Sequence, residues 1–151
     1  MSEKTVSYLR DLKRYAKEHI FEETLSYIKN TLGAHRASRV AEGVYENRVV
    51  KCTTLNGRTL WFYLGKKEVY LIIPMTFCSC MDFLINVVER KIVSTCYHLA
   101  SQILAENYGK YRRLSNITVD EEEAILEEVE KYKYSPTLVR LLVKKEQIKN
   151  I

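Results

Sequence analysis

The N-terminal part of the chain carries a helical pattern of apolar positions. Apolar side chains recur at steps of three and four residues between Thr5 and Leu32, which places them on one face of a helix. Gly33 follows the last of them and is a typical helix end. His19 interrupts the pattern, which is equally compatible with one long helix and with two. We predict an N-terminal helical segment over residues 1–34, with apolar positions Val6, Leu9, Leu12, Ala16, Ile20, Phe21, Leu25, Ile28 and Leu32.

The period of the pattern changes between Arg39 and Met75. Two turn signals, Asn56-Gly57 and Gly65-Lys66-Lys67, divide this segment into three runs rich in β-forming residues. Pro74 ends the third run because its ring removes a backbone donor. The segment therefore predicts a three-stranded antiparallel β-meander, whose first run contains Val40, Val44, Val49, Val50, Thr53 and Thr54.

Helical signals return after the meander. A short helix is expected over residues 83–88, and a longer one begins at Ser94 or Thr95 and ends at Gly109. Two further helices are expected in the C-terminal part. Thr118-x-x-Glu121 is a capping box, and Ser135-Pro136 supplies an N-cap followed by a proline that suits the first helical position.

This order of elements predicts an α+β fold in a single domain. The chain has 151 residues, which is within the range of one domain with one modest core. We divide it into the N-terminal helical segment at 1–34, a central module at 35–109 and C-terminal helices at 110–151. In the central module, the three-stranded meander is followed by a helix that carries metal ligands.

The cysteine spacing favours metal binding over disulfides. The chain has four cysteines, of which Cys78 and Cys80 are separated by one residue, a spacing that strains a mutual disulfide. The N-terminus also lacks an export signal, so we expect a cytoplasmic protein whose thiols are reduced. Cys52 lies in a predicted strand and is interpreted as core packing.

Two short motifs together predict a metal site. Cys78-Ser-Cys80 and Cys96-Tyr-His98 are separated by fifteen residues. Either pair alone is more often a chance pairing of buried side chains than a set of ligands. Both together, after a strand-ending proline and at a helix start, supply the thiolate and imidazole donors that zinc prefers. Four protein ligands leave no open position, so the site is expected to hold one structural Zn²⁺, which contributes on the order of 10–16 kcal/mol in small zinc modules.

The string Phe77-Cys-Ser-Cys-Met-Asp-Phe83 followed by Cys96-Tyr-His-Leu99 resembles the SWIM zinc-finger family. It is most similar to the small SWIM protein of the Shu-type recombination complex and its archaeal relatives. Tyr97 stands where the family often has lysine, and Ser101 where it often has alanine. Neither difference removes a ligand, although the first weakens a phosphate contact that a lysine would make.

This resemblance implies zinc together with a role in binding nucleic acid or protein. For the Shu-like group it implies an accessory factor in homologous recombination and DNA repair, bound to a RecA-like ATPase paralogue. Single-stranded or branched DNA is then the expected nucleic acid. The alternative is a free-standing DNA-binding zinc-finger protein. The two differ in salt dependence, because direct phosphate contacts weaken steeply as ionic strength rises.

Basic residues near aromatic ones are the candidate DNA contacts. Lys110-Tyr111-Arg112-Arg113 follows the predicted metal helix and could bracket a phosphate and stack a base. The same tetrad would also complement a helix dipole while remaining solvated. Lys66 and Lys67, in a predicted turn, have the same two interpretations. The net charge of +5 permits a polyanionic partner without requiring one.

The amphipathic helices are the candidate protein-binding surface. Residues 5–32 and the apolar final helix around Leu138 could fold over the meander or form a homodimer. A thin sheet needs less cover than these helices supply, and this surplus predicts a protein partner. An enzyme is not expected, because the sequence has no phosphate-binding glycine loop, nucleophile elbow or deaminase pattern. A membrane span is not expected either, since the longest apolar run is 69–75.

Overall fold

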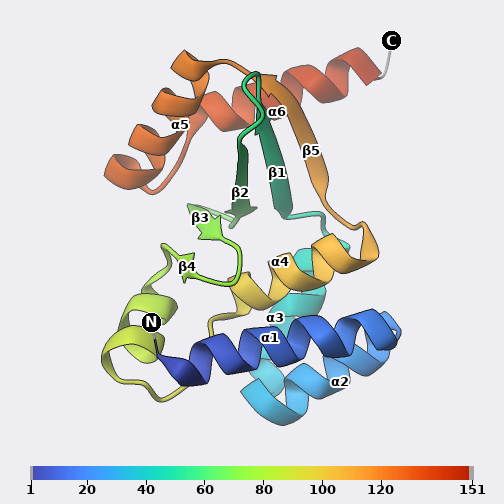
Figure 1. Cartoon of the computed structure of the whole chain (residues 1–151). Helices are drawn as coiled ribbons and strands as arrows, with labels where there is room; N and C mark the ends of the chain where they lie inside the picture. Colours follow the sequence, from blue (N-terminus) through green and yellow to red (C-terminus); the bar gives the residue numbers. More distant parts are fainter. Residues whose placement is uncertain (1, 150–151) are drawn as a thin grey trace.

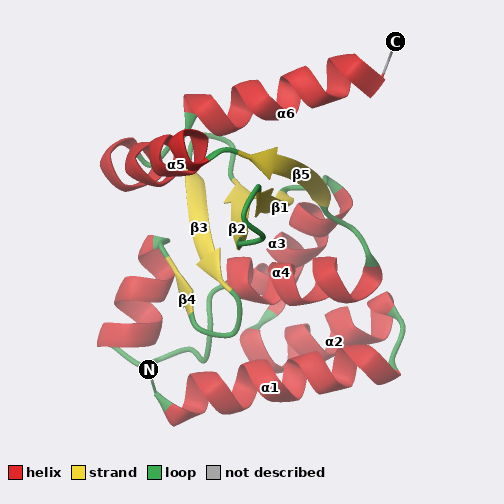
Figure 2. Cartoon of the chain, turned by 45° about the horizontal axis from the view of Figure 1, so that its top comes forward, coloured by secondary structure: helices red, strands yellow, loops and turns green. Residues whose placement is uncertain are grey.

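A five-stranded mixed sheet lies between two groups of helices (Figures 1 and 2). The structure is a computed structural model and describes residues 2–149. The predicted α+β class is confirmed. The strand order is β4-β3-β2-β1-β5, with bounds β1 (Val49–Thr54), β2 (Thr59–Leu64), β3 (Val69–Ile73), β4 (Phe77–Cys78) and β5 (Arg112–Ile117).

The predicted meander forms the centre of this sheet. β1, β2 and β3 pair antiparallel through turns at the two predicted positions. The prediction of three strands was nevertheless incomplete, because β4 pairs antiparallel with β3 and β5 pairs parallel with β1. In β5 only Leu114 and Ile117 are buried, and the register shifts between Cys52 and Thr54. This strand therefore lacks the alternation that marks a strand in a sequence.

Three helices precede the sheet: α1 (Glu3–Glu18), α2 (Phe21–Leu32) and α3 (Ala34–Tyr45). The N-terminal pattern thus forms two helices, and the chain is extended at His19, which ends α1. The expectation that the β-meander begins near Arg39 was wrong. Val40 and Val44 are β-branched, but their spacing of four places both on the buried face of α3.

The remaining helices follow the sequence signals closely. The short helix is a π-helix, η1 (Phe83–Glu89), and the helix carrying the ligand motif is α4 (Tyr97–Tyr108). Gly109 ends α4 in the left-handed conformation, with φ of 68°. The capping box at the start of α5 (Val119–Tyr132) is formed, and α6 (Pro136–Lys149) begins at the predicted proline.

Each face of the sheet has its own core. On one face, side chains of β1 to β4 pack with α1, α3 and α4, and α4 is buried along most of its length. On the other face, Val50, Cys52 and Phe62 pack with Ile125 of α5 and Leu138 of α6. No helix in residues 2–149 is both long and apolar enough to span a bilayer.

Covering two faces uses the helical apolar surface that the sequence analysis assigned to a partner. Leu9, Leu12 and Ile28 of the N-terminal helices are fully buried within the chain. In α6, Leu138 is fully buried and Leu142 is nearly so. Much of the apolar surface of these helices is thus buried within the chain, although Ile20 and Val143 stay exposed, and the protein partner stays a prediction.

Candidate metal centre

The four residues of the two motifs come together in the structure. The Sγ atoms of Cys78, Cys80 and Cys96 and a ring nitrogen of His98 all lie within 4.8 Å of one another. All four side chains are buried, with exposures of 3% or less. Cys78 ends β4, Cys80 precedes η1, Cys96 is the N-cap of α4 and His98 lies in its first turn. The predicted juxtaposition of a strand end and a helix start is therefore present.

Backbone pairing holds the first two cysteines in place. Ile72 of β3 is the register partner of Cys78. Ser79 then binds Leu71 twice, because its N–H donates to the Leu71 carbonyl at 3.1 Å and its Oγ accepts from the Leu71 N–H at 2.9 Å. The chain reaches this pairing through a tight turn in which Met75 has φ of 65°. With Ser79 fixed on β3, both flanking cysteines are brought to the same site.

Neighbouring hydrogen bonds complete the surroundings of the sulfur atoms. The N–H of Phe83 donates to Cys80 Sγ at 3.3 Å, and the N–H of Leu99 bonds Cys96. Asp82 accepts two hydrogen bonds from Arg36 of α3, at 2.8 and 3.2 Å. These contacts fix the start of η1, immediately after Cys80, against the N-terminal helices. Such outer contacts hold ligands in a defined orientation.

His98 is the clearest indication that a metal belongs here. Both ring nitrogens are buried and have no hydrogen-bond partner among the described residues. A buried polar atom without a partner is costly, and metal coordination would satisfy one nitrogen. The ring is enclosed by three tyrosines, with centroid distances of 4.5 Å to Tyr63, 4.4 Å to Tyr70 and 4.0 Å to Tyr97.

The three thiols of the cluster form hydrogen bonds with one another, and these bonds shift their pKa values. Burial raises the pKa of Cys78 and of Cys96. Hydrogen bonds from these two thiols lower the pKa of Cys80, which is thus the first to be a thiolate. A divalent cation would displace the remaining protons and offset two of the three thiolate charges, which leaves a formal charge of −1. The donor set therefore fits one metal ion held by three sulfur atoms and one nitrogen.

Cys52 is not part of this cluster. It lies in β1, fully buried in the core on the α5 and α6 face, as the sequence predicted. Burial raises its pKa to about 12, so it remains a neutral thiol at physiological pH. In experiments on the thiols, Cys52 is the buried cysteine outside the cluster with which the other three can be compared.

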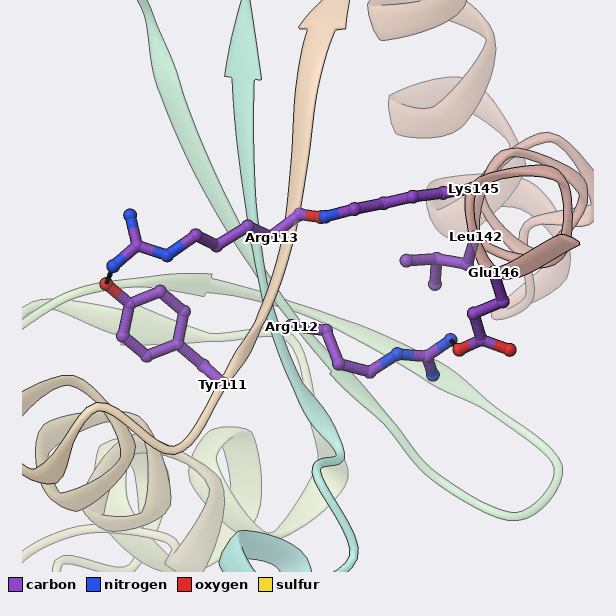
Figure 3. A pocket seen from close by; sticks show the side chains of 6 residues that line it. All are labelled: Tyr111, Arg112, Arg113, Leu142, Lys145 and Glu146. Carbon is purple, nitrogen blue, oxygen red and sulfur yellow. Dashed lines mark hydrogen bonds and ion pairs between the residues drawn. The ribbon is translucent and has the colours of Figure 1, made fainter. Parts of the chain in front are cut away.

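The basic tetrad does not follow α4 as one patch, because Arg112 and Arg113 begin β5 and point to opposite sides of it (Figure 3). Arg112 forms an ion pair with Glu146 of α6. Arg113 lies over the Tyr111 ring at 4.9 Å and donates to the Tyr111 hydroxyl at 2.7 Å. Between β5 and α6 these residues line a pocket of about 330 Å³. Lys110 is exposed.

Lys66 and Lys67 line a different pocket, of about 370 Å³, which also contains the three tyrosines around His98. These three tyrosines were not predicted from the sequence as a group. A signal was available, because Tyr63 and Tyr70 face each other across the hairpin whose turn was predicted. Arg39 and Arg48 complete the basic lining of this pocket.

Comparisons of the chain with known proteins find no similar protein. No family model matches the chain, and the searches of curated proteins and of solved structures give no match either. The class that the fold and site define is therefore an α+β domain with a buried Cys₃His cluster able to hold one metal ion.

Proposed function

We propose that this chain is a non-enzymatic binding module whose central part is held together by one structural zinc ion. The observation that carries this proposal is the buried cluster in which both nitrogens of His98 lack a partner. Three thiolates and one imidazole are a donor set typical of structural zinc. Four protein ligands, all of them buried, are typical of a structural metal site.

Metal analysis of the purified chain tests the zinc centre. We expect one zinc per chain by mass spectrometry, and tetrahedral ligand-field bands after exchange with Co²⁺. Cys80→Ser should lose most of the metal, whereas Cys52→Ser should keep it. Protein that is folded and free of metal after purification with zinc present would contradict the proposal.

For the biological role we propose an accessory factor in homologous recombination and DNA repair, bound to a RecA-like ATPase paralogue. The support is the motif resemblance together with a row of exposed apolar side chains beside the metal ligands. Met81 and Leu84 are 61% and 38% exposed, and Val88 and Ile92 are 49% and 61% exposed. Isolated apolar residues are common on surfaces, but a row along one short segment favours a protein contact.

Affinity capture from the source cells tests this partner. We expect a RecA-like ATPase to be retained after nuclease treatment and at high salt, because apolar contacts depend little on ionic strength. Leu84→Glu with Val88→Glu should abolish its capture while leaving the zinc content unchanged. As a control, Lys4→Glu with Lys13→Glu on α1 makes an even larger change in surface charge outside this row and should have no effect. Retention of the ATPase by the apolar-row variant would contradict this surface.

The second candidate is a free-standing DNA-binding protein that uses Lys110, Tyr111, Arg112 and Arg113. The ion pair of Arg112 with Glu146 and the contact of Arg113 with Tyr111 speak against it, since both guanidinium groups already have partners. Charge reversal of both arginines tests this candidate. Loss of DNA binding in folded, zinc-loaded protein would support it, and unchanged affinity would exclude these residues as the DNA site.

A further inference from the structure

The tyrosines around His98 also form the wall of an open pocket. Tyr63, Tyr70 and Tyr97 come from β2, β3 and α4, and all three line the cavity of about 370 Å³. Tyr63 is 4% exposed and forms the floor, whereas Tyr70 and Tyr97 are only partly buried. The pocket therefore offers aromatic surface at a position fixed by the metal centre.

The rim of the same pocket is basic. Arg39 and Arg48 are paired with Glu42 at 3.1 Å and Glu46 at 2.7 Å, respectively. Lys66 and Lys67, in the turn between β2 and β3, are exposed, and their side chains have no partner among the described residues. The two lysines are thus the positive charge of the pocket that no ion pair within the described part of the chain neutralises. Apart from the carboxylates paired with the arginines, the pocket lining contains one acidic residue, Glu68.

The pocket lies at the end of the sheet where β5 begins. Arg112 is the register partner of Val50, which in turn pairs with Phe62 near the end of β2. The turn that carries Lys66 and Lys67 follows β2 directly, so it shares this end of the sheet with Lys110. Because neighbouring strands are about 4.8 Å apart and β1 lies between them, β2 and β5 are roughly 10 Å apart across the sheet.

We propose that this pocket, formed by Tyr70 and Tyr97 with Lys66 and Lys67, binds single-stranded nucleic acid, with a base against the tyrosines and the flanking phosphates at the lysines. The proposal rests on the recombination role proposed above and adds a nucleic-acid site to it. Aromatic rings combined with a basic rim are the usual means of binding unpaired strands. A duplex keeps its bases stacked inside, and an acidic peptide would need the charge but not the rings.

Fluorescence anisotropy with a labelled oligothymidylate, on the full zinc-loaded chain, tests the site. We expect Lys66→Glu with Lys67→Glu to weaken binding at least tenfold and to reduce the salt slope by about 1.4, as for two lost phosphate contacts on a single strand. Lys4→Glu with Lys13→Glu on α1 makes the same change in net charge and should bind normally. Tyr97→Leu should weaken binding about tenfold, and Tyr97→Phe should restore it.

The outcomes separate this site from the wider role. One outcome is that binding survives charge reversal of Lys66 and Lys67 but is lost on charge reversal of Arg112 and Arg113. That result would overturn the pocket as the binding site and keep the nucleic-acid role. No binding by the parent chain overturns both. Equal competition by an oligoglutamate of the same charge also overturns the pocket as a nucleic-acid site. Zinc content measured for each variant ensures that a loss at Tyr97 is not a loss of the metal.

Discussion

The Tyr63 hydroxyl lies directly over Gly43, so that a β-carbon at position 43 would be 2.3 Å from Tyr63 Oη. The ring of Tyr63 in turn contacts His98, with centroids 4.5 Å apart. A glycine on α3 thus determines how close a strand residue can come to His98.

Gly43→Ala is therefore expected to destabilise the fold by about 1–3 kcal/mol, because Tyr63 is buried and cannot move aside freely. Urea unfolding of zinc-loaded protein measures this. Tyr63→Phe removes the closest atom, so the double variant should lose less than the sum of the two single variants. Strict additivity would show that the contact does not limit the packing.

The thiols of the chain should react in two groups. With metal bound, we expect no thiol to react with a disulfide reagent in the folded protein. A chelator should make Cys78, Cys80 and Cys96 reactive, whereas Cys52 should react later, because it is buried in the other core. Cys52→Ala should remove only the slow phase. A reactive thiol in the folded, metal-loaded chain would contradict the closed site.

Alkaline pH should destabilise the protein partly through Cys52. Burial raises the pKa of this thiol from its ordinary 9.0 to about 12 in the folded state, so the unfolded chain loses this proton first. The corresponding stability is complete below pH 9 and is lost as the pH rises from 9 to about 12.

Unfolding free energies at pH 8 and at about pH 10.5 measure this contribution. The parent chain should lose about 2 kcal/mol more than Cys52→Ala between these two conditions. Buried tyrosines whose pKa is also raised, such as Tyr8, affect both proteins equally. Equal losses in the two proteins would mean that Cys52 does not titrate in this way.

Glu128 of α5 should hold the start of α6. Its Oε1 accepts hydrogen bonds from Ser135 Oγ at 2.8 Å and from the Thr137 N–H at 3.0 Å, and its Oε2 accepts one from Thr137 Oγ1 at 2.7 Å. Glu128→Ala is expected to cost about 1.5–3 kcal/mol. Glu127→Ala removes only an exposed pair with Lys131 and should cost less than about 1 kcal/mol. Chemical denaturation of both variants gives the comparison.

Local signals predicted the features whose cause is local. Pro74 ends β3, Gly109 ends α4 and Thr118 caps α5, because each acts through its own backbone or the next few residues. The juxtaposition of Cys78, Cys80, Cys96 and His98 could also be predicted, because thiols and an imidazole at these spacings have few other uses together. Cys52 was correctly left out of that set.

Features that depend on residues far apart in the chain could not be predicted from local sequence signals. β5 forms because it pairs with β1 and because Leu114 packs beside Cys52. A segment with only two buried residues has too weak a pattern to predict this strand from the sequence. Val40 and Val44 have β propensity, but their spacing of four also fits a helix, and their packing in the core with α4 favours the helix. The tyrosines around His98 come from three elements, so no short motif contains them.

The parallel pairing of β1 with β5 has a kinetic consequence. Residues 55–111 separate the two strands in the chain, and the four residues of the candidate metal cluster lie within that segment. Joining the strands closes a long loop, whose entropic cost slows the search for the pair. A metal that ties Cys78 to Cys96 shortens the free part of that loop. Zinc added before refolding should therefore speed the recovery of Trp61 fluorescence relative to zinc added afterwards, and equal rates would mean that the strands meet without it.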